Sequence, residues 1–108
     1  MKTTPKQNIL VVDDAPTAID ILVRNLVSRG YCIFTASNVV DAVKILESAP
    51  IDLVITDYKM PRISGLDLIR HIRANFSETE VIMITGYATV KGAVQAVKMG
   101  ADEYLPKP

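Results

Sequence analysis

The sequence alternates short apolar runs with longer stretches of helical periodicity, and this alternation constrains the fold more than any other feature. Four runs rich in Val and Ile, without internal Gly or Pro, cover residues 9–13, 31–36, 53–57 and 81–85, and a weaker fifth covers 103–106. Strands buried on both faces have continuous apolar runs, and repeated βα units build parallel sheets. The pattern predicts an α/β fold with a doubly wound, parallel, five-stranded sheet.

The stretches between these runs carry the spacing and the end signals of four helices. Pro16 suits a first helical turn, and Gly30 suits the position after the last turn. Asn38 and Ser64 each stand three residues before an aspartate, which resembles a capping box at the start of the second and third helices. The fourth helix has an apolar stripe that ends at Gly100 and consists of Val90, Ala93, Val94 and Val97.

The composition fits one domain that folds around an apolar core. A chain of 108 residues suits a single core, and 49% hydrophobic with 22% charged residues is typical of globular proteins. Twelve basic and twelve acidic side chains cancel, so the net charge favours neither nucleic acid nor an anionic membrane. The lone Cys32 and the lack of an apolar run of about 18 residues indicate a soluble protein of the reducing cytoplasm.

Polar residues follow the ends of the predicted strands. In a parallel sheet, the carboxyl ends of the strands gather at one edge, where ligands bind. That edge would carry Asp13, Asp14, Asp57, Thr85 and Lys107. Three carboxylates held together either keep a proton or bind a cation, and Mg²⁺ prefers oxygen ligands and leaves room for phosphoryl oxygens. The edge therefore suits phosphoryl transfer with an aspartate nucleophile, for which Asp57 at the centre is the best candidate.

Four segments resemble the receiver domain family of two-component response regulators. They are VVDDAP, DLVITDYKMPRISGLDLI, IMITGYA and ADEYLPKP, and together they span nearly the whole chain. The resemblance implies a flavodoxin-like sheet with strand order 2-1-3-4-5. Members of the family normally continue into a fifth helix, so residues 1–108 are expected to form a single receiver domain that lacks this C-terminal helix.

The resemblance also implies a role for each site residue. Asp57 would accept a phosphoryl group from a sensor histidine kinase, so the chain would be a phosphoacceptor that promotes its own phosphorylation and dephosphorylation rather than an enzyme. The Mg²⁺ ligands would be Asp13, Asp14, Asp57 and the backbone carbonyl of Lys59. Thr85 and Lys107 would hold phosphoryl oxygens.

An aromatic residue on strand five turns inward in this family when the phosphoryl group is held, and Tyr104 matches that position. The surface of helix four and strand five would then change and control a downstream output domain, for which transcription regulators of the enhancer-binding kind are the nearest resemblance. We expect no direct contact with nucleic acid or membrane. The sheet face left bare by the missing helix is expected to promote homo-oligomers.

Several residues also have structural interpretations. Asp13 and Asp14 alone would suit a helix cap, and Tyr104 is as well explained by plain strand packing. His71 is expected to be a solvated histidine, and Cys32 a small buried apolar residue. Three other functions stay open: a docking module that works without phosphate, a flavin-binding protein with residues 85–89 as a phosphate loop, and an aspartyl-phosphate hydrolase.

Overall fold

The computed structural model describes residues 7–60 and 62–107 and contains one five-stranded sheet with the predicted order β2-β1-β3-β4-β5. Every neighbouring pair of strands is parallel. The strands are β1 (Asn8–Val12), β2 (Cys32–Ala36), β3 (Leu53–Asp57), β4 (Glu80–Thr85) and β5 (Glu103–Pro106). The predicted bounds of β3 and β5 agree with the structure, those of β2 and β4 differ by one residue at the start, and β1 is shifted by one residue at both ends. The α/β prediction is thereby confirmed.

Four helices connect the strands, and two of them begin as their capping signals predict. The helices are α1 (Pro16–Val27), α2 (Val39–Ser48), α3 (Gly65–Asn75) and α4 (Val90–Met99). At α2, the Asn38 side chain accepts a hydrogen bond from the Asp41 backbone N–H at 2.8 Å. At α3, the Asp67 carboxylate accepts from the Ser64 N–H and hydroxyl, each at 3.2 Å. These local bonds fix where each helix enters the sheet edge.

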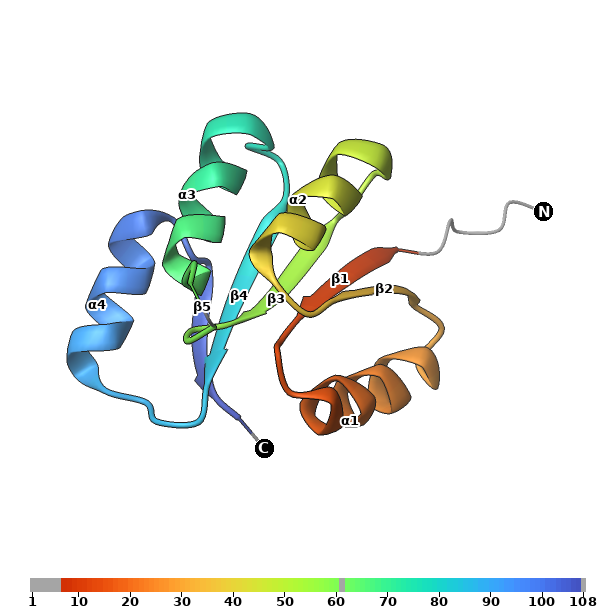
Figure 1. Cartoon of the computed structure of the whole chain (residues 1–108), viewed down its shortest axis with the longest axis horizontal. Coiled ribbons are helices and arrows are strands. Elements are labelled where there is room, and N and C mark those ends of the chain that lie inside the picture. Colours follow the sequence, from red (N-terminus) through yellow and green to blue (C-terminus); the bar gives the residue numbers. More distant parts are fainter. Residues whose placement is uncertain (1–6, 61, 108) are drawn as a thin grey trace.

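The helices cover the two faces of the sheet unequally (Figure 1). Helices α2, α3 and α4 lie on one face, where fully buried Leu10, Val54 and Met83 anchor the larger core. Helix α1 lies on the other face and packs against a smaller cluster around Val11 and Ile84. None of the α1 residues, all of which the structure describes, is buried. The apolar stripe of α1 is therefore only half covered.

The sheet also leaves apolar surface open beside α1. Leu105 on β5 is 44% exposed, and Ile21 on α1 is 50% exposed. A cavity of about 210 Å³ lies between α1 and β4, lined in part by Leu22 and Ile84. Across residues 7–60 and 62–107, no helix has the length and apolar content that a membrane crossing requires.

Two predictions about single residues are wrong. Cys32 is exposed rather than buried, because it begins the edge strand β2. His71 is half-buried rather than solvated, since its ring lies against Phe76 with ring centres 6.1 Å apart. Its Nε2 is shielded from solvent and has no hydrogen-bond partner among the residues that the structure describes.

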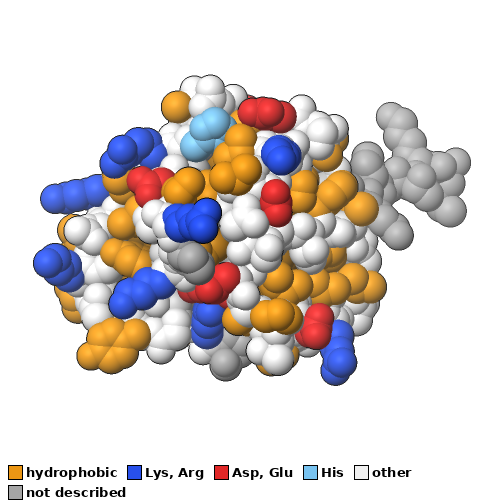
Figure 2. Space-filling model, viewed as in Figure 1, with side chains coloured by type: hydrophobic (Ala, Val, Ile, Leu, Met, Phe, Trp, Pro, Cys, Tyr) orange, Lys and Arg blue, Asp and Glu red, His pale blue; other side chains and the backbone are white. Residues whose placement is uncertain are grey.

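The apolar stripe of α4 faces solvent instead of the core. Val90 is 84% exposed and Val97 is 61% exposed, whereas Gly92 and Ala96 are buried. Small residues on the inner side let the helix lie close to the sheet, so the larger Val side chains have no space there. In Figure 2, apolar and basic side chains alternate over the α4 side of the molecule.

Candidate functional site

Asp13 stands directly after β1 and is fully buried. Its backbone N–H donates to the Ala36 carbonyl at 3.1 Å and so extends the pairing of β1 with β2. One carboxylate oxygen, Oδ1, accepts from the Ala15 N–H at 2.9 Å. The next residue, Asp14, is exposed at the mouth of the site. One acidic group is thus held rigidly while its neighbour faces solvent.

Asp57 is the last residue of β3 and lies across from Ile84 on β4. The first residue of α3, Gly65, packs against its backbone so closely that a Cβ at position 65 would overlap the Asp57 carbonyl oxygen. The Gly65 N–H in turn donates to the Tyr58 carbonyl at 3.0 Å. The position of Asp57 is therefore fixed from both sides, by the sheet and by the start of α3.

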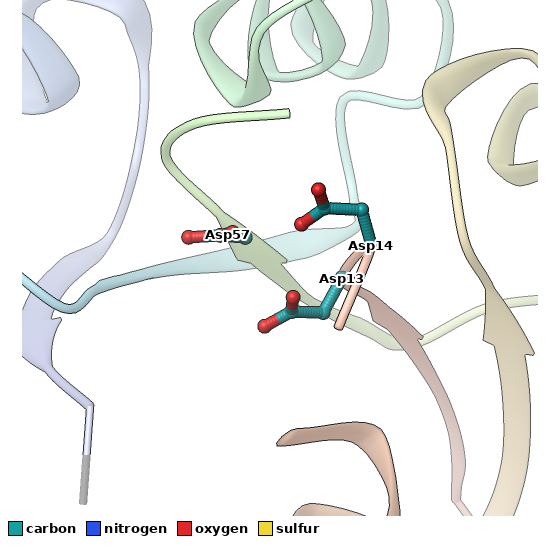
Figure 3. Close-up of side chains that lie close together, drawn as sticks. All are labelled: Asp13, Asp14 and Asp57. Carbon is teal, nitrogen blue, oxygen red and sulfur yellow. The ribbon is translucent and has the colours of Figure 1, made fainter. Parts of the chain in front are cut away.

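The three carboxylates converge as the strand-end argument predicts. Figure 3 shows Asp13 and Asp14 beyond the end of β1 and Asp57 at the end of β3, with their carboxylates pointing to the same side. One carboxylate oxygen from each residue lies within 4.8 Å of the other two. This spacing is short enough for a single cation to contact more than one of them.

Lys107 supplies the positive charge of the site. Its Nζ lies 2.9 Å from Oδ2 of Asp13 and 3.4 Å from Oδ2 of Asp57. The backbone N–H of Lys107 donates to the Thr85 carbonyl at 2.8 Å, which places the side chain at the edge where β5 ends. A residue distant in sequence from both aspartates thus reaches them because all three strands end at one edge.

The electrostatics of the site leave the carboxylates short of positive charge. Burial raises the pKa of Asp57 above its ordinary value, and the nearby charge of Asp13 raises it further, whereas Lys107 acts in the opposite direction. Burial alone would lower the pKa of Lys107, but its hydrogen bond to Asp13 and the charges of both aspartates raise it overall. A second cation would relieve the remaining repulsion between the two aspartates.

These residues fit a hard divalent ion. The donor set is all oxygen, comes from three carboxylates, and includes one exposed member that leaves the ion open to water. This combination suits Mg²⁺, which binds few carboxylates and keeps several waters, and it also suits Ca²⁺. Lys59, whose backbone carbonyl is the remaining predicted ligand, is exposed two residues after Asp57.

Thr85 and Tyr104 border the same open cleft, which has a volume of about 680 Å³ and is lined also by Asp57, Lys59 and Lys107. The Thr85 hydroxyl accepts from the Tyr87 N–H at 3.2 Å, so it is engaged within its own loop. The Tyr104 hydroxyl accepts from the Thr89 N–H at 3.3 Å. The cleft therefore contains every predicted phosphoryl-handling residue together with the predicted switch residue.

Among the residues that line this cleft, Tyr58, Gly92 and Gln95 had no site role in the sequence analysis. Tyr58 and Gln95 share a hydrogen bond of 2.8 Å across 37 residues of sequence. Neither a helical glutamine nor a tyrosine after a strand signals such a contact, because the pairing depends on how α4 lies over the loop that follows β3.

Comparison with known proteins places the chain in a family. The family model of the response regulator receiver domain matches residues 9–108. The response regulator protein PilR of Pseudomonas aeruginosa is 39% identical over 95% of this chain and 23% of its own length. The acid tolerance regulatory protein ActR of Rhizobium meliloti is 35% identical over 96% of this chain and 54% of its own length. The chain belongs to the receiver domain family of two-component response regulators.

Solved structures agree with this assignment. A Burkholderia pseudomallei response regulator with a phosphorylated aspartic acid, a calcium ion and citrate superposes with a TM-score of 0.89 at 37% identity, over 95% of this chain and 61% of that one. TrrA of Thermotoga maritima, in complex with Mg²⁺ and beryllofluoride, gives 0.85 at 38% identity, over 94% and 87%. The beryllofluoride-activated NtrC4 receiver domain dimer gives 0.88 at 36% identity, over 94% and 84%.

This chain spans about half or less of the length of the curated relatives named above. Those relatives therefore contain further segments that this sequence does not match. The family assignment supports a phosphorylatable receiver domain. The activity of any larger protein does not follow from it.

Proposed function

We propose that Asp57 accepts a phosphoryl group from the phosphohistidine of a sensor histidine kinase, in a reaction that depends on Mg²⁺. The observation that carries the proposal is the convergence of three carboxylates and one ammonium at the carboxyl edge of the sheet, within the distances given above. A carboxylate oxygen of Asp57 attacks phosphorus while the phosphorus–nitrogen bond of the donor breaks. The imidazole leaves with the electron pair of that bond, and an acyl phosphate forms.

The other residues of the site have separate roles in this reaction. Asp13, Asp14, Asp57 and the carbonyl of Lys59 hold the metal ion, which supplies positive charge to the phosphoryl oxygens. Lys107 already lies 3.4 Å from Asp57 and holds a second phosphoryl oxygen. Thr85 holds a third after its hydroxyl leaves the Tyr87 N–H. The reaction needs no other catalytic side chain, so the domain acts as a phosphoacceptor that assists its own phosphorylation and dephosphorylation.

Output follows from a change in the surface of α4 and β5. Tyr104 is the residue that responds, since it lies on β5 and bonds to Thr89 at the start of α4. Phosphorylation shifts the populations of two arrangements only as far as the phosphoryl group binds one of them better. The changed surface then acts on a downstream output domain, with transcription regulation as the expected outcome.

On this proposal, the part of the chain that the structure describes is a single cytoplasmic receiver domain. The face around α1 and β5 is only half covered, because Leu105 and Ile21 expose apolar surface there. We expect this face to promote self-association of the chain. Light scattering that finds a monomer at high protein concentration would count against self-association.

Beryllofluoride binding tests the proposed function, because this compound resembles a phosphoryl group without a covalent step. With Mg²⁺ present, we expect chemical-shift changes around Asp57 and Thr85 and a higher melting temperature. Asp57→Asn is the matched control and should abolish both effects. An unresponsive wild-type protein would favour a docking module that works without phosphate.

A further inference from the structure

Part of the cleft lining consists of residues that the proposed phosphoryl transfer does not use. They come from the loop after β3, from α4 and from β5, and they are Tyr58, Gly92, Gln95 and Tyr104. We refer to these four residues as the latch. The latch lies between the phosphoacceptor strand and the helix whose surface is expected to change.

The Tyr104 ring occupies a defined place in the latch. Its hydroxyl accepts from the Thr89 N–H at 3.3 Å, just before α4 begins. Its ring meets that of Tyr58 edge to face, with ring centres 6.3 Å apart and an angle of 81° between the planes. This arrangement is favourable for aromatic pairs. Tyr104 is thus held between the start of α4 and the residue that follows Asp57.

Gly92 provides the space for the Tyr104 hydroxyl. A Cβ at position 92 would lie 2.5 Å from Oη and 3.2 Å from Cζ of Tyr104, and 3.0 Å from Oγ1 of Thr89. Real Cβ atoms are essentially never found at the first of these distances, so Tyr104 would have to move. Glycine is less favourable than alanine inside a helix, so helix stability does not account for a glycine at position 92. The room that it leaves for the Tyr104 hydroxyl does account for it.

Gln95 joins α4 to the residue next to the phosphoacceptor. It accepts a hydrogen bond of 2.8 Å from the Tyr58 hydroxyl. The Tyr58 backbone is itself fixed, because its N–H donates to the Ile84 carbonyl at 2.9 Å and its carbonyl accepts from the Gly65 N–H at 3.0 Å. The Tyr58 side chain therefore connects the loop after Asp57 to α4.

We propose that Gly92 and Gln95 are positioning residues of the switch: Gly92 permits the orientation of Tyr104 seen here, and Gln95 ties α4 to Tyr58. The inference rests on the proposed function. It assigns the contacts of the latch seen here, Tyr58 with Gln95 and Tyr104 with Thr89 and Tyr58, to the arrangement that binds a phosphoryl group better. A phosphoryl-like ligand at Asp57 then binds more tightly while these contacts are present. Breaking the contacts weakens its binding without removing any group that touches the ligand.

Gly92→Ala tests the first half of the proposal. In the ligand-free protein, the nuclear Overhauser contacts between the Tyr58 and Tyr104 rings should disappear. Beryllofluoride with Mg²⁺ should bind roughly three- to tenfold more weakly, which corresponds to the net loss of about one hydrogen bond. The melting temperature should change little, because the better helix propensity of alanine offsets the lost contact between the Tyr58 and Tyr104 rings. Unchanged or tighter binding overturns the assignment of the latch to the ligand-bound arrangement.

A double-variant cycle separates the hydroxyl from general damage to α4. In a Tyr104→Phe background the atom that a Cβ meets at 2.5 Å is absent, so Gly92→Ala should weaken beryllofluoride binding by less than it does in the wild type. Equal weakening in both backgrounds would show that Gly92 does not act through Tyr104 and would overturn the proposal.

Gln95→Ala tests the second half, with Lys98→Ala as its control on an exposed position of the same helix. We expect a similar loss of beryllofluoride affinity for Gln95→Ala and no change for Lys98→Ala. Equal affinities of the two variants overturn the role of Gln95. If wild-type protein binds no beryllofluoride, the proposed function itself fails, whereas persistent ring contacts in Gly92→Ala overturn the latch alone.

Discussion

Replacing Lys107 with methionine is the most informative perturbation of the site, because it removes the charge and keeps a side chain of similar length. The fully buried Asp13 side chain would lose an ammonium at 2.9 Å, and Asp57 would lose it at 3.4 Å. Breaking a buried pair costs about 3–5 kcal/mol, and an exposed pair contributes less than about 1 kcal/mol. The Lys107 side chain is 24% exposed, so we expect an intermediate loss of about 2 kcal/mol.

Urea unfolding at pH 7 with a metal chelator would measure this loss, with Lys98→Met as the control. The raised pKa of Lys107 means that its contribution is present below the ordinary value of 10.5 and is lost as the pH rises through the folded value. The raised pKa of Asp57 means that this carboxylate starts to take up a proton above its ordinary 3.8 as the pH falls. The difference between wild type and Lys107→Met should therefore be largest near neutral pH and shrink toward about pH 4. The same loss of unfolding free energy at pH 7 and at about pH 4 would refute this electrostatic reasoning.

Two further predictions concern stability. Asp57→Asn should raise the urea midpoint of metal-free protein at pH 7. The raised folded pKa of Asp57 means that its contribution to stability is full below its ordinary 3.8 and is lost as the pH rises through the folded value, so the charged group is unfavourable at pH 7. Mg²⁺ should narrow the difference in midpoint by stabilising the wild type more, and a lower midpoint for Asp57→Asn would contradict this reasoning. Arg73→Ala should lose about 2–3 kcal/mol, since about 1 kcal/mol attaches to each hydrogen bond and its guanidinium donates to the carbonyls of Gly100 and Thr79 and pairs with Asp102. Arg70→Ala, on the exposed side of α3, is the control and should change the free energy of unfolding by less than about 0.5 kcal/mol.

The sequence predicts the sheet well because the strands are buried on both faces and carry uninterrupted apolar runs. The bounds of β3 follow directly from such a run, and Asn38 marks the start of α2 through a hydrogen bond that is local in sequence. The packed side of α4 could not be predicted in the same way. The helical spacing of apolar residues predicts that Val90 and Val97 face the sheet. In the structure α4 lies close to the sheet, and the small residue Gly92 is on the inner side instead.

The charged residues of the candidate site can be predicted from the sequence, as the strands can. Parallel topology alone brings Asp13, Asp57 and Lys107 to one edge, and the structure has them within ion-pair distance. The latch is different, since the Tyr58–Gln95 hydrogen bond depends on a helix orientation that no local pattern encodes. The exposure of Cys32 depends likewise on β2 being the edge strand, which is a property of the whole sheet.

The central claim is that Asp57 itself carries the phosphoryl group, and intact-mass measurement after incubation with acetyl phosphate and Mg²⁺ tests it most directly. We predict a gain of one phosphoryl group in the wild type, and no gain in Asp57→Asn or when a chelator removes the metal. A wild-type protein that stays unmodified, or an Asp57→Asn variant that gains the same mass, would contradict the account.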